Sequence, residues 1–79
     1  MSNLERYNSV FCTVFEVENS VLEGLDYQGI EKWDSVGHMS LISALEDEFG
    51  IMFDTDDIID FDSYAKGKTI LSEHYEIDF

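Results

Sequence analysis

The chain has 79 residues, of which 18 are Asp or Glu and 4 are Lys or Arg, so its formal net charge is −14 at pH 7. This charge argues against nucleic acid and anionic membranes as ligands, because both are bound through clustered basic side chains. Hydrophobic residues make up 44% of the chain and aromatic residues 14%, which is enough apolar surface for a folded core. We therefore expect one small acidic domain, residues 1–79, that binds basic partners.

The sequence predicts neither a disulfide framework nor a targeting signal. The single cysteine, Cys12, has no partner for an intramolecular disulfide, and with two histidines in the chain it does not complete a closed zinc site. We expect Cys12 to be a small buried residue rather than a reactive thiol. Because no basic and apolar leader and no window of membrane-spanning length appear, the expectation is a cytoplasmic protein. We also expect the chain to be a monomer.

The first predicted helix runs from Asn3 to Val17. Apolar residues recur there at steps of three and four, which places them on one helical face; they are Leu4, Tyr7, Val10, Phe11, Val14 and Phe15. The segment from Asn19 to Trp33 then carries two glycines among mixed polar residues, and we expect a long loop there.

The clearest predicted helix begins at Asp34, whose carboxylate suits the free amides and the positive end of a helix N-terminus. Gly50 stands where such a helix commonly ends in the left-handed conformation. The apolar stripe between them consists of Val36, Met39, Leu41, Ile42, Leu45 and Phe49.

The remaining sequence predicts two further helical pieces. An acidic segment from Asp54 to Asp62 holds about one turn, and Ser63 caps a last helix that includes Ile70, while the tail 75–79 is expected to be frayed. Since no hairpin signal is present, we predict an all-α fold, a small bundle of three main helices plus one short helix.

Motifs for catalysis and metal binding are missing. Ser35 and His38 lie three residues apart on one predicted helix, but a Ser–His pair without a cleft is a poor nucleophile and base. The acidic segment from Asp54 does not fit a calcium-binding EF-hand loop, because Ile58 and Ile59 occupy its fifth and sixth positions. We therefore expect neither enzymatic activity nor a specific metal site.

Ser35 is the residue best placed for a chemical role. It stands in the first turn of the strongest helix beside Asp34, where a phosphodiester on its hydroxyl would face free backbone amides and the positive helix end. Position alone nevertheless favours simple helix capping by Ser35, because Asp and Ser are common at helix starts.

The wider segment reverses that preference. The residues Trp33-Asp-Ser-Val-Gly-His-Met-Ser-Leu41 and their continuation Ile42-Ser-Ala-Leu-Glu-Asp-Glu-Phe-Gly-Ile51 closely resemble the phosphopantetheine attachment segment of acyl carrier proteins. In that family an Asp-Ser-Leu motif opens the second helix, and here Val36 replaces the leucine. The segments 56–58 and 63–64 look like the family's short third helix and the start of its fourth, so the resemblance covers essentially the whole chain.

The resemblance implies a carrier that performs no chemistry itself. A phosphopantetheinyl transferase would move a 4′-phosphopantetheine arm from coenzyme A to Ser35, and the arm would hold an acyl or aminoacyl group as a thioester. Further partners would be an acyl-loading ligase or synthetase and downstream acyl-transfer enzymes with basic patches. The Trp-Asp-Ser-x-Gly-His form is more similar to stand-alone specialised bacterial carriers than to the housekeeping fatty-acid carrier.

The resemblance also gives the candidate partner contacts. No Lys or Arg occurs from Trp33 to Ala65, and a surface of one sign favours fast encounters with basic partners. Among the acids, Asp34 is the candidate for the transferase, and the apolar centre of the interface would be Val36 and Met39. The candidates for ion pairs are Glu46, Asp47 and Asp56.

Several readings stay open at this stage. Met39 serves either the core or the partner interface, His38 is expected to be a plain surface histidine, and Gly37 costs its helix roughly 1 kcal/mol relative to alanine. The chief alternative function is an acidic helical interaction module without a prosthetic group, which binds a basic partner or mimics nucleic acid. A relative that keeps the carrier fold without the arm is a second alternative.

Overall fold

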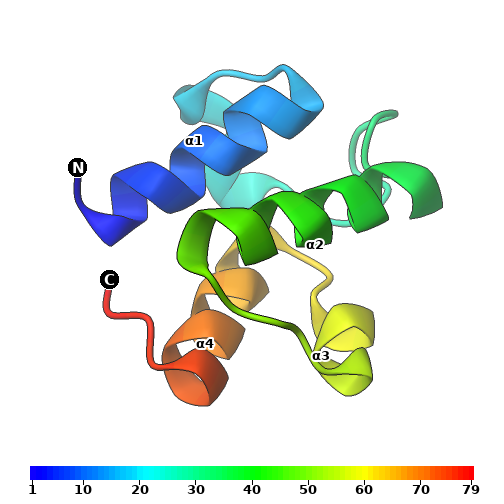
Figure 1. Cartoon of the computed structure of the whole chain (residues 1–79). Helices are drawn as coiled ribbons and strands as arrows, with labels where there is room; N and C mark the ends of the chain where they lie inside the picture. Colours follow the sequence, from blue (N-terminus) through cyan, green and yellow to red (C-terminus); the bar gives the residue numbers. More distant parts are fainter.

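A computed structural model describes residues 1–79 as helices joined by turns, without a β-sheet (Figure 1). The elements in chain order are α1 (Asn3–Phe15), the 3₁₀ helix η1 (Asn19–Gly24), α2 (Ser35–Phe49), α3 (Thr55–Asp60) and α4 (Tyr64–Tyr75). Because α1, α2 and α4 are long and α3 is short, the predicted all-α bundle of three main helices plus one short helix is confirmed. None of these helices combines the length and the apolar character needed to cross a bilayer.

The boundaries of α1 follow from local hydrogen bonds. Ser2 and Glu5 form a capping box, in which Ser2 Oγ accepts the Glu5 N–H at 3.1 Å and Glu5 Oε1 accepts the Ser2 N–H at 3.0 Å. The helix ends at Phe15, two residues before the predicted Val17, because Glu16 takes the left-handed conformation with φ 56°.

The two caps predicted for later helices are both confirmed. Gly50 ends α2 with φ 64°, and its N–H donates to the carbonyl of Glu46. Ser63 starts α4, and its Oγ accepts the N–H of Lys66 at 2.9 Å.

An aromatic core joins the helices. Phe11 of α1 lies at its centre, 5.6 Å from the ring of Trp33 and 5.4 Å from that of Tyr64. α2 adds buried aliphatic side chains, namely Leu41, Ile42 and Leu45. Full burial of one such apolar side chain is worth about 1.5–3 kcal/mol, so this core is what holds together a chain of high net charge.

The segment from Asn19 to Trp33, expected to be a long loop, contains a short helix and packs into the core. Its first part forms η1, and Leu22, Leu25 and Trp33 are buried in the core. The Leu25 carbonyl also accepts the N–H of Tyr64 at 2.9 Å, which ties the segment to the start of α4. The predicted loop is confirmed for residues 25–33, which lie in turns and irregular backbone, and is wrong for η1. These apolar residues are spaced without a helical or strand period, so their burial comes from tertiary packing alone.

The C-terminal tail, residues 75–79, was expected to be frayed, and this prediction is wrong. The Phe79 ring packs against Tyr7 at a centroid distance of 5.3 Å, and the Asn3 amide donates to the carbonyl of Asp78 at 3.0 Å. The two chain ends consequently lie side by side (Figure 1).

Cys12 lies at the edge of the core and is half-buried. Its Sγ is 3.3 Å from Oδ1 of Asn19, the first residue of η1. The thiol thus packs against apolar neighbours as expected for a small hydrophobic residue, although it is less enclosed than predicted.

Candidate functional site

Ser35 is the first residue of α2, and its side chain is exposed. The N-cap is Asp34, whose Oδ1 accepts the Gly37 N–H at 2.8 Å and whose carbonyl accepts the His38 N–H at 2.8 Å. The Ser35 hydroxyl makes no hydrogen bond within the chain. Helix capping is therefore performed by Asp34, and the explanation of Ser35 as the cap does not hold.

Backbone amides at the same helix end are free. The N–H groups of Ser35 and Val36 have no acceptor in the chain, as is usual for the first turn of a helix. Together with the positive end of the α2 dipole, they favour a negatively charged group beside the Ser35 hydroxyl.

The start of α2 is held by a histidine. Trp33 is completely buried, and its Nε1–H donates to His38 Nδ1 at 3.0 Å. Since Nδ1 accepts, the neutral ring carries its proton on Nε2 and donates it to the carbonyl of Ile58, 2.8 Å away. The expectation of a plain surface histidine was wrong, because His38 is half-buried and links α2 to the core and to α3.

Gly37 marks a close backbone approach. A Cβ at this position would overlap the carbonyl oxygen of Lys32, in the turn that precedes α2. Only glycine fits such an approach, so the roughly 1 kcal/mol that it costs the helix is offset by the packing of the turn. The turn in question leads directly to Ser35.

Two apolar side chains flank the serine on the surface. Val36 is 74% exposed and Met39 is 52% exposed, so the interpretation of Met39 as a core residue is wrong. Both line a shallow hollow with Ser35 along the outer face of α2, together with Ser40, Ser43, Ala44 and Asp47. The structure thus brings Ser35, Val36 and Met39 together.

The four candidate acids divide into two pairs. Asp34 is used as the helix cap, and Glu46 is half-buried with Oε2 accepting the N–H of Phe53 at 2.9 Å. Asp47 near the end of α2 and Asp56 in the first turn of α3 are exposed and make no hydrogen bond or ion pair. The acids available for an incoming basic side chain are therefore Asp47 and Asp56.

One buried acid was missed by the sequence reasoning. Asp57 is 6% exposed; its Oδ2 accepts the Tyr75 hydroxyl at 2.7 Å, and its Oδ1 is 2.8 Å from His74 Nδ1. Partial burial is the first cause that raises the pKa of the Tyr75 hydroxyl, and the neighbouring carboxylate of Asp57 adds to it. The role is structural, since these bonds fasten α3 to α4. No signal in the sequence distinguishes Asp57 from its acidic neighbours.

Groups that could hold a metal ion, meaning three or more His, Cys, Asp or Glu side chains brought together, are not found in the structure. The site is accordingly an exposed serine at a capped helix start, flanked by apolar side chains, with acids farther along α2 and α3. Comparisons of the chain with protein-family models, with curated proteins and with solved structures give no significant match.

Proposed function

We propose that this chain is a carrier protein whose Ser35 bears a 4′-phosphopantetheine arm. The observation that carries the proposal is the exposed Ser35 hydroxyl, which is free of hydrogen bonds because Asp34 caps the helix in its place. Attachment of a group to that oxygen consequently breaks no bond that holds the fold. The resemblance of residues 33–51 to the attachment segment of acyl carrier proteins also supports the Ser35 hydroxyl as the point of attachment.

The residues around Ser35 suit a phosphodiester. Its negative charge would lie beside the free N–H groups of Ser35 and Val36 and at the positive end of α2. When bound, the arm supplies a thiol that holds an acyl or aminoacyl group as a thioester. This chain's own part is to fix the arm, to neutralise the phosphate charge and to present the cargo.

Exposed side chains near Ser35 suit transient contact with other enzymes. Val36 and Met39 offer an apolar centre, and the free carboxylates of Asp47 and Asp56 attract basic partners. Such partners are a phosphopantetheinyl transferase, an acyl-loading ligase or synthetase, and downstream acyl-transfer enzymes. Attraction between exposed charges speeds association more than it slows dissociation, which suits a shuttle; we place it among the stand-alone specialised carriers of the bacterial cytoplasm.

Intact mass tests the proposal directly. The folded protein is incubated with coenzyme A, magnesium and a broad-specificity phosphopantetheinyl transferase, alongside the variants Ser35→Ala and Ser40→Ala. Ser40 is the matched control, since it is also exposed on α2. The expected result is a gain of one phosphopantetheine on the parent and on Ser40→Ala, and no gain on Ser35→Ala.

The net charge of −14 supports one other function, an acidic helical interaction module without a prosthetic group. It would bind a basic site on a protein partner, as nucleic acid does. Absence of any mass gain by folded parent protein would favour this alternative and overturn the carrier proposal.

A further inference from the structure

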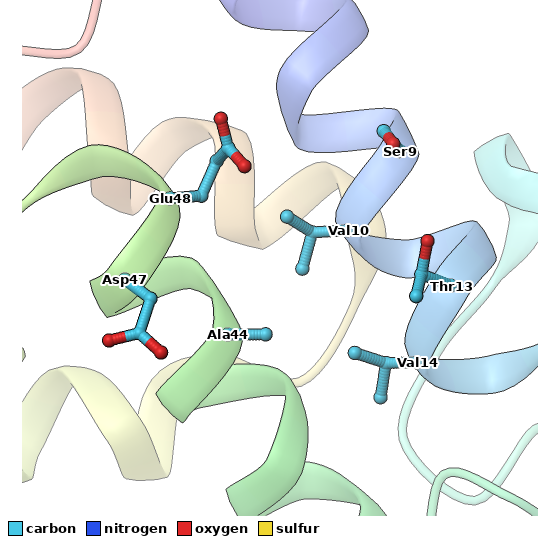
Figure 2. Close-up of a pocket in the computed structure, with 7 residues that line it drawn as sticks. All are labelled: Ser9, Val10, Thr13, Val14, Ala44, Asp47 and Glu48. Carbon is cyan, nitrogen blue, oxygen red and sulfur yellow. The ribbon is translucent and has the colours of Figure 1, made fainter.

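A groove runs between α1 and α2, away from the start of α2 (Figure 2). Its floor is apolar and narrow, because Val10 and Val14 project from α1 toward Ala44 of α2. Its rim is polar and is made by Ser9, Thr13, Asp47 and Glu48. A floor of two valines and an alanine leaves room for a small aliphatic group beside hydrogen-bonding atoms.

The two carboxylates of the rim differ in one respect. Glu48 Oε2 is paired with Arg6 Nε at 2.8 Å, and Arg6 also bonds the Glu48 carbonyl and stacks on the Phe49 ring. The charge of Glu48 is therefore already compensated by Arg6. Asp47 has no hydrogen bond and no ion pair, so it is the carboxylate of the groove that lacks a counter-charge.

The groove is continuous with the surface that carries Ser35. Ala44 and Asp47 line both the groove and the shallow hollow that begins at Ser35. From Ser35 to Ala44 the helix rises roughly 13 Å, at about 1.5 Å per residue. A pantetheine chain has about thirteen bonds between phosphorus and sulfur and extends roughly 16 Å, by analogy with the extension of a peptide chain. Cargo on the end of such an arm therefore reaches the groove.

We propose that this groove receives the cargo and that the cargo is a small aminoacyl group, an inference that rests on the carrier function proposed above. Its ammonium lies at the carboxylate of Asp47, on the α2 side of the rim. Its aliphatic side chain lies on the apolar floor.

Charge and size separate this cargo from other acyl groups. A cargo with a free carboxylate is repelled by Asp47 and by the surrounding net charge. A long alkyl chain outgrows a floor made of two valines and an alanine. A neutral short acyl group fits by size but leaves the carboxylate of Asp47 without a partner.

Two matched cargoes test the inference. The transferase loads Ser35 with pantetheine arms that end in an alanyl or a propionyl group, joined by an amide so that neither is hydrolysed. The two differ only by the ammonium, which is mostly protonated near pH 6.5 because an α-amino group has a pKa of about 7.7–8.0. Intact mass confirms loading, and backbone amide NMR shifts at Thr13, Val14 and Ala44 report occupancy of the groove.

The expected result is a shift of these amides with the alanyl arm, absent with the propionyl arm and reduced by high salt. Asp47→Asn abolishes the shift, whereas Glu73→Gln, which removes an equal charge from an exposed position on α4, leaves it intact. Loaded protein whose groove amides respond alike to both arms, or whose response survives Asp47→Asn, overturns the aminoacyl inference alone. Failure to load Ser35 overturns the carrier function as well, and the mass measurement distinguishes the two failures.

Discussion

The indole Nε1–H of Trp33 donates to Nδ1 of His38 at 3.0 Å, and this contact ties the first turns of α2 to the buried core. Trp33 is completely buried and stacks on the ring of Phe15 at a centroid distance of 5.2 Å. The imidazole then bonds the carbonyl of Ile58 at 2.8 Å. Ser35 lies between Trp33 and His38 in the sequence, so the backbone on both sides of its exposed hydroxyl is anchored to the core.

Removal of this histidine is expected to destabilise the fold. His38→Ala leaves the buried N–H of Trp33 without its acceptor, and an unsatisfied buried group of this kind costs about 1–3 kcal/mol of unfolding free energy. Urea unfolding followed by the fluorescence of Trp33, the single tryptophan, measures the loss.

His38→Gln is the informative companion, because its amide keeps both an acceptor and a donor, and it should recover part of the stability. Ser40→Ala, an exposed change on the same helix, should unfold within about 0.5 kcal/mol of the parent. An unchanged urea midpoint for His38→Ala would contradict the role given to the Trp33–His38 bond.

Gly37 gives a second prediction, in which helix propensity and packing oppose each other. Propensity alone would make Gly37→Ala stabilising by roughly 1 kcal/mol. We expect the opposite sign, a loss of about 1–3 kcal/mol, because the added Cβ overlaps the backbone carbonyl of Lys32 and overpacking carries such a cost.

Gly24 supplies the control for this substitution. A Cβ at Gly24 meets no atom within 4 Å, so Gly24→Ala should change the unfolding free energy by less than about 0.5 kcal/mol. Chemical denaturation of the two variants side by side checks the pair, and stabilisation by Gly37→Ala would show that propensity prevails over packing.

Local signals explain which parts of this fold are predictable from the sequence. The caps Gly50 and Ser63 act within three or four residues of their own position, so the neighbouring residues predict them. The helix order follows from the same signals. For the candidate site, the position of Ser35 at a helix start was predictable for this reason.

Tertiary contacts explain what the sequence does not disclose. The bond between His38 and Ile58 joins residues 20 positions apart, and the packing of Phe79 on Tyr7 joins the two ends of the chain. Nothing in the spacing of the residues from 19 to 33 signals that they are drawn into the core. The free hydroxyl of Ser35 likewise follows from a choice between two adjacent caps that only the geometry resolves.

Alkaline pH provides a third prediction, through Tyr7. Burial raises the pKa of Tyr7 well above its ordinary value of 10.0, and the neighbouring Tyr64 adds to the shift. Because the pKa of Tyr7 is higher in the folded state than in the unfolded state, the contribution of neutral Tyr7 to the unfolding free energy is fully present below pH 10. This contribution is lost as the pH rises above that value. The unfolding free energy should therefore fall steeply on the alkaline side.

Tyr7→Phe separates the titration from the hydrogen bond. The Tyr7 hydroxyl donates to the Tyr64 carbonyl at 2.7 Å, so the variant should be less stable than the parent by about 1–2 kcal/mol near pH 7. Above pH 10 this gap should narrow, since the variant has no buried phenol to ionise. Tyr27→Phe is the control, since it removes a hydroxyl without a hydrogen bond in the chain, and its unfolding free energy should fall with alkaline pH as the parent's does. An equal difference in unfolding free energy between the parent and Tyr7→Phe at every pH would refute the assignment to Tyr7.

Charge repulsion gives the last prediction, which concerns salt and magnesium. The chain has eighteen acidic side chains and only four basic ones. Three of the acids line one surface hollow beside α3, namely Asp54, Asp56 and Asp60. Mutual repulsion of these carboxylates destabilises the folded state and is screened over about 10 Å at 0.1 M ionic strength. The melting temperature near neutral pH should therefore rise on addition of moderate sodium chloride or millimolar magnesium.

A variant with fewer charges shows whether the carboxylates are responsible. The double substitution Asp56→Asn with Asp60→Asn removes two exposed charges from the hollow, so it should melt higher than the parent at low salt and gain less from added magnesium. Asp57 stays untouched in this design, because its buried carboxylate accepts the Tyr75 hydroxyl and contacts His74. A flat melting temperature across the salt series in the parent would mean that repulsion does not limit stability, and the strength of the aromatic core would then be the explanation.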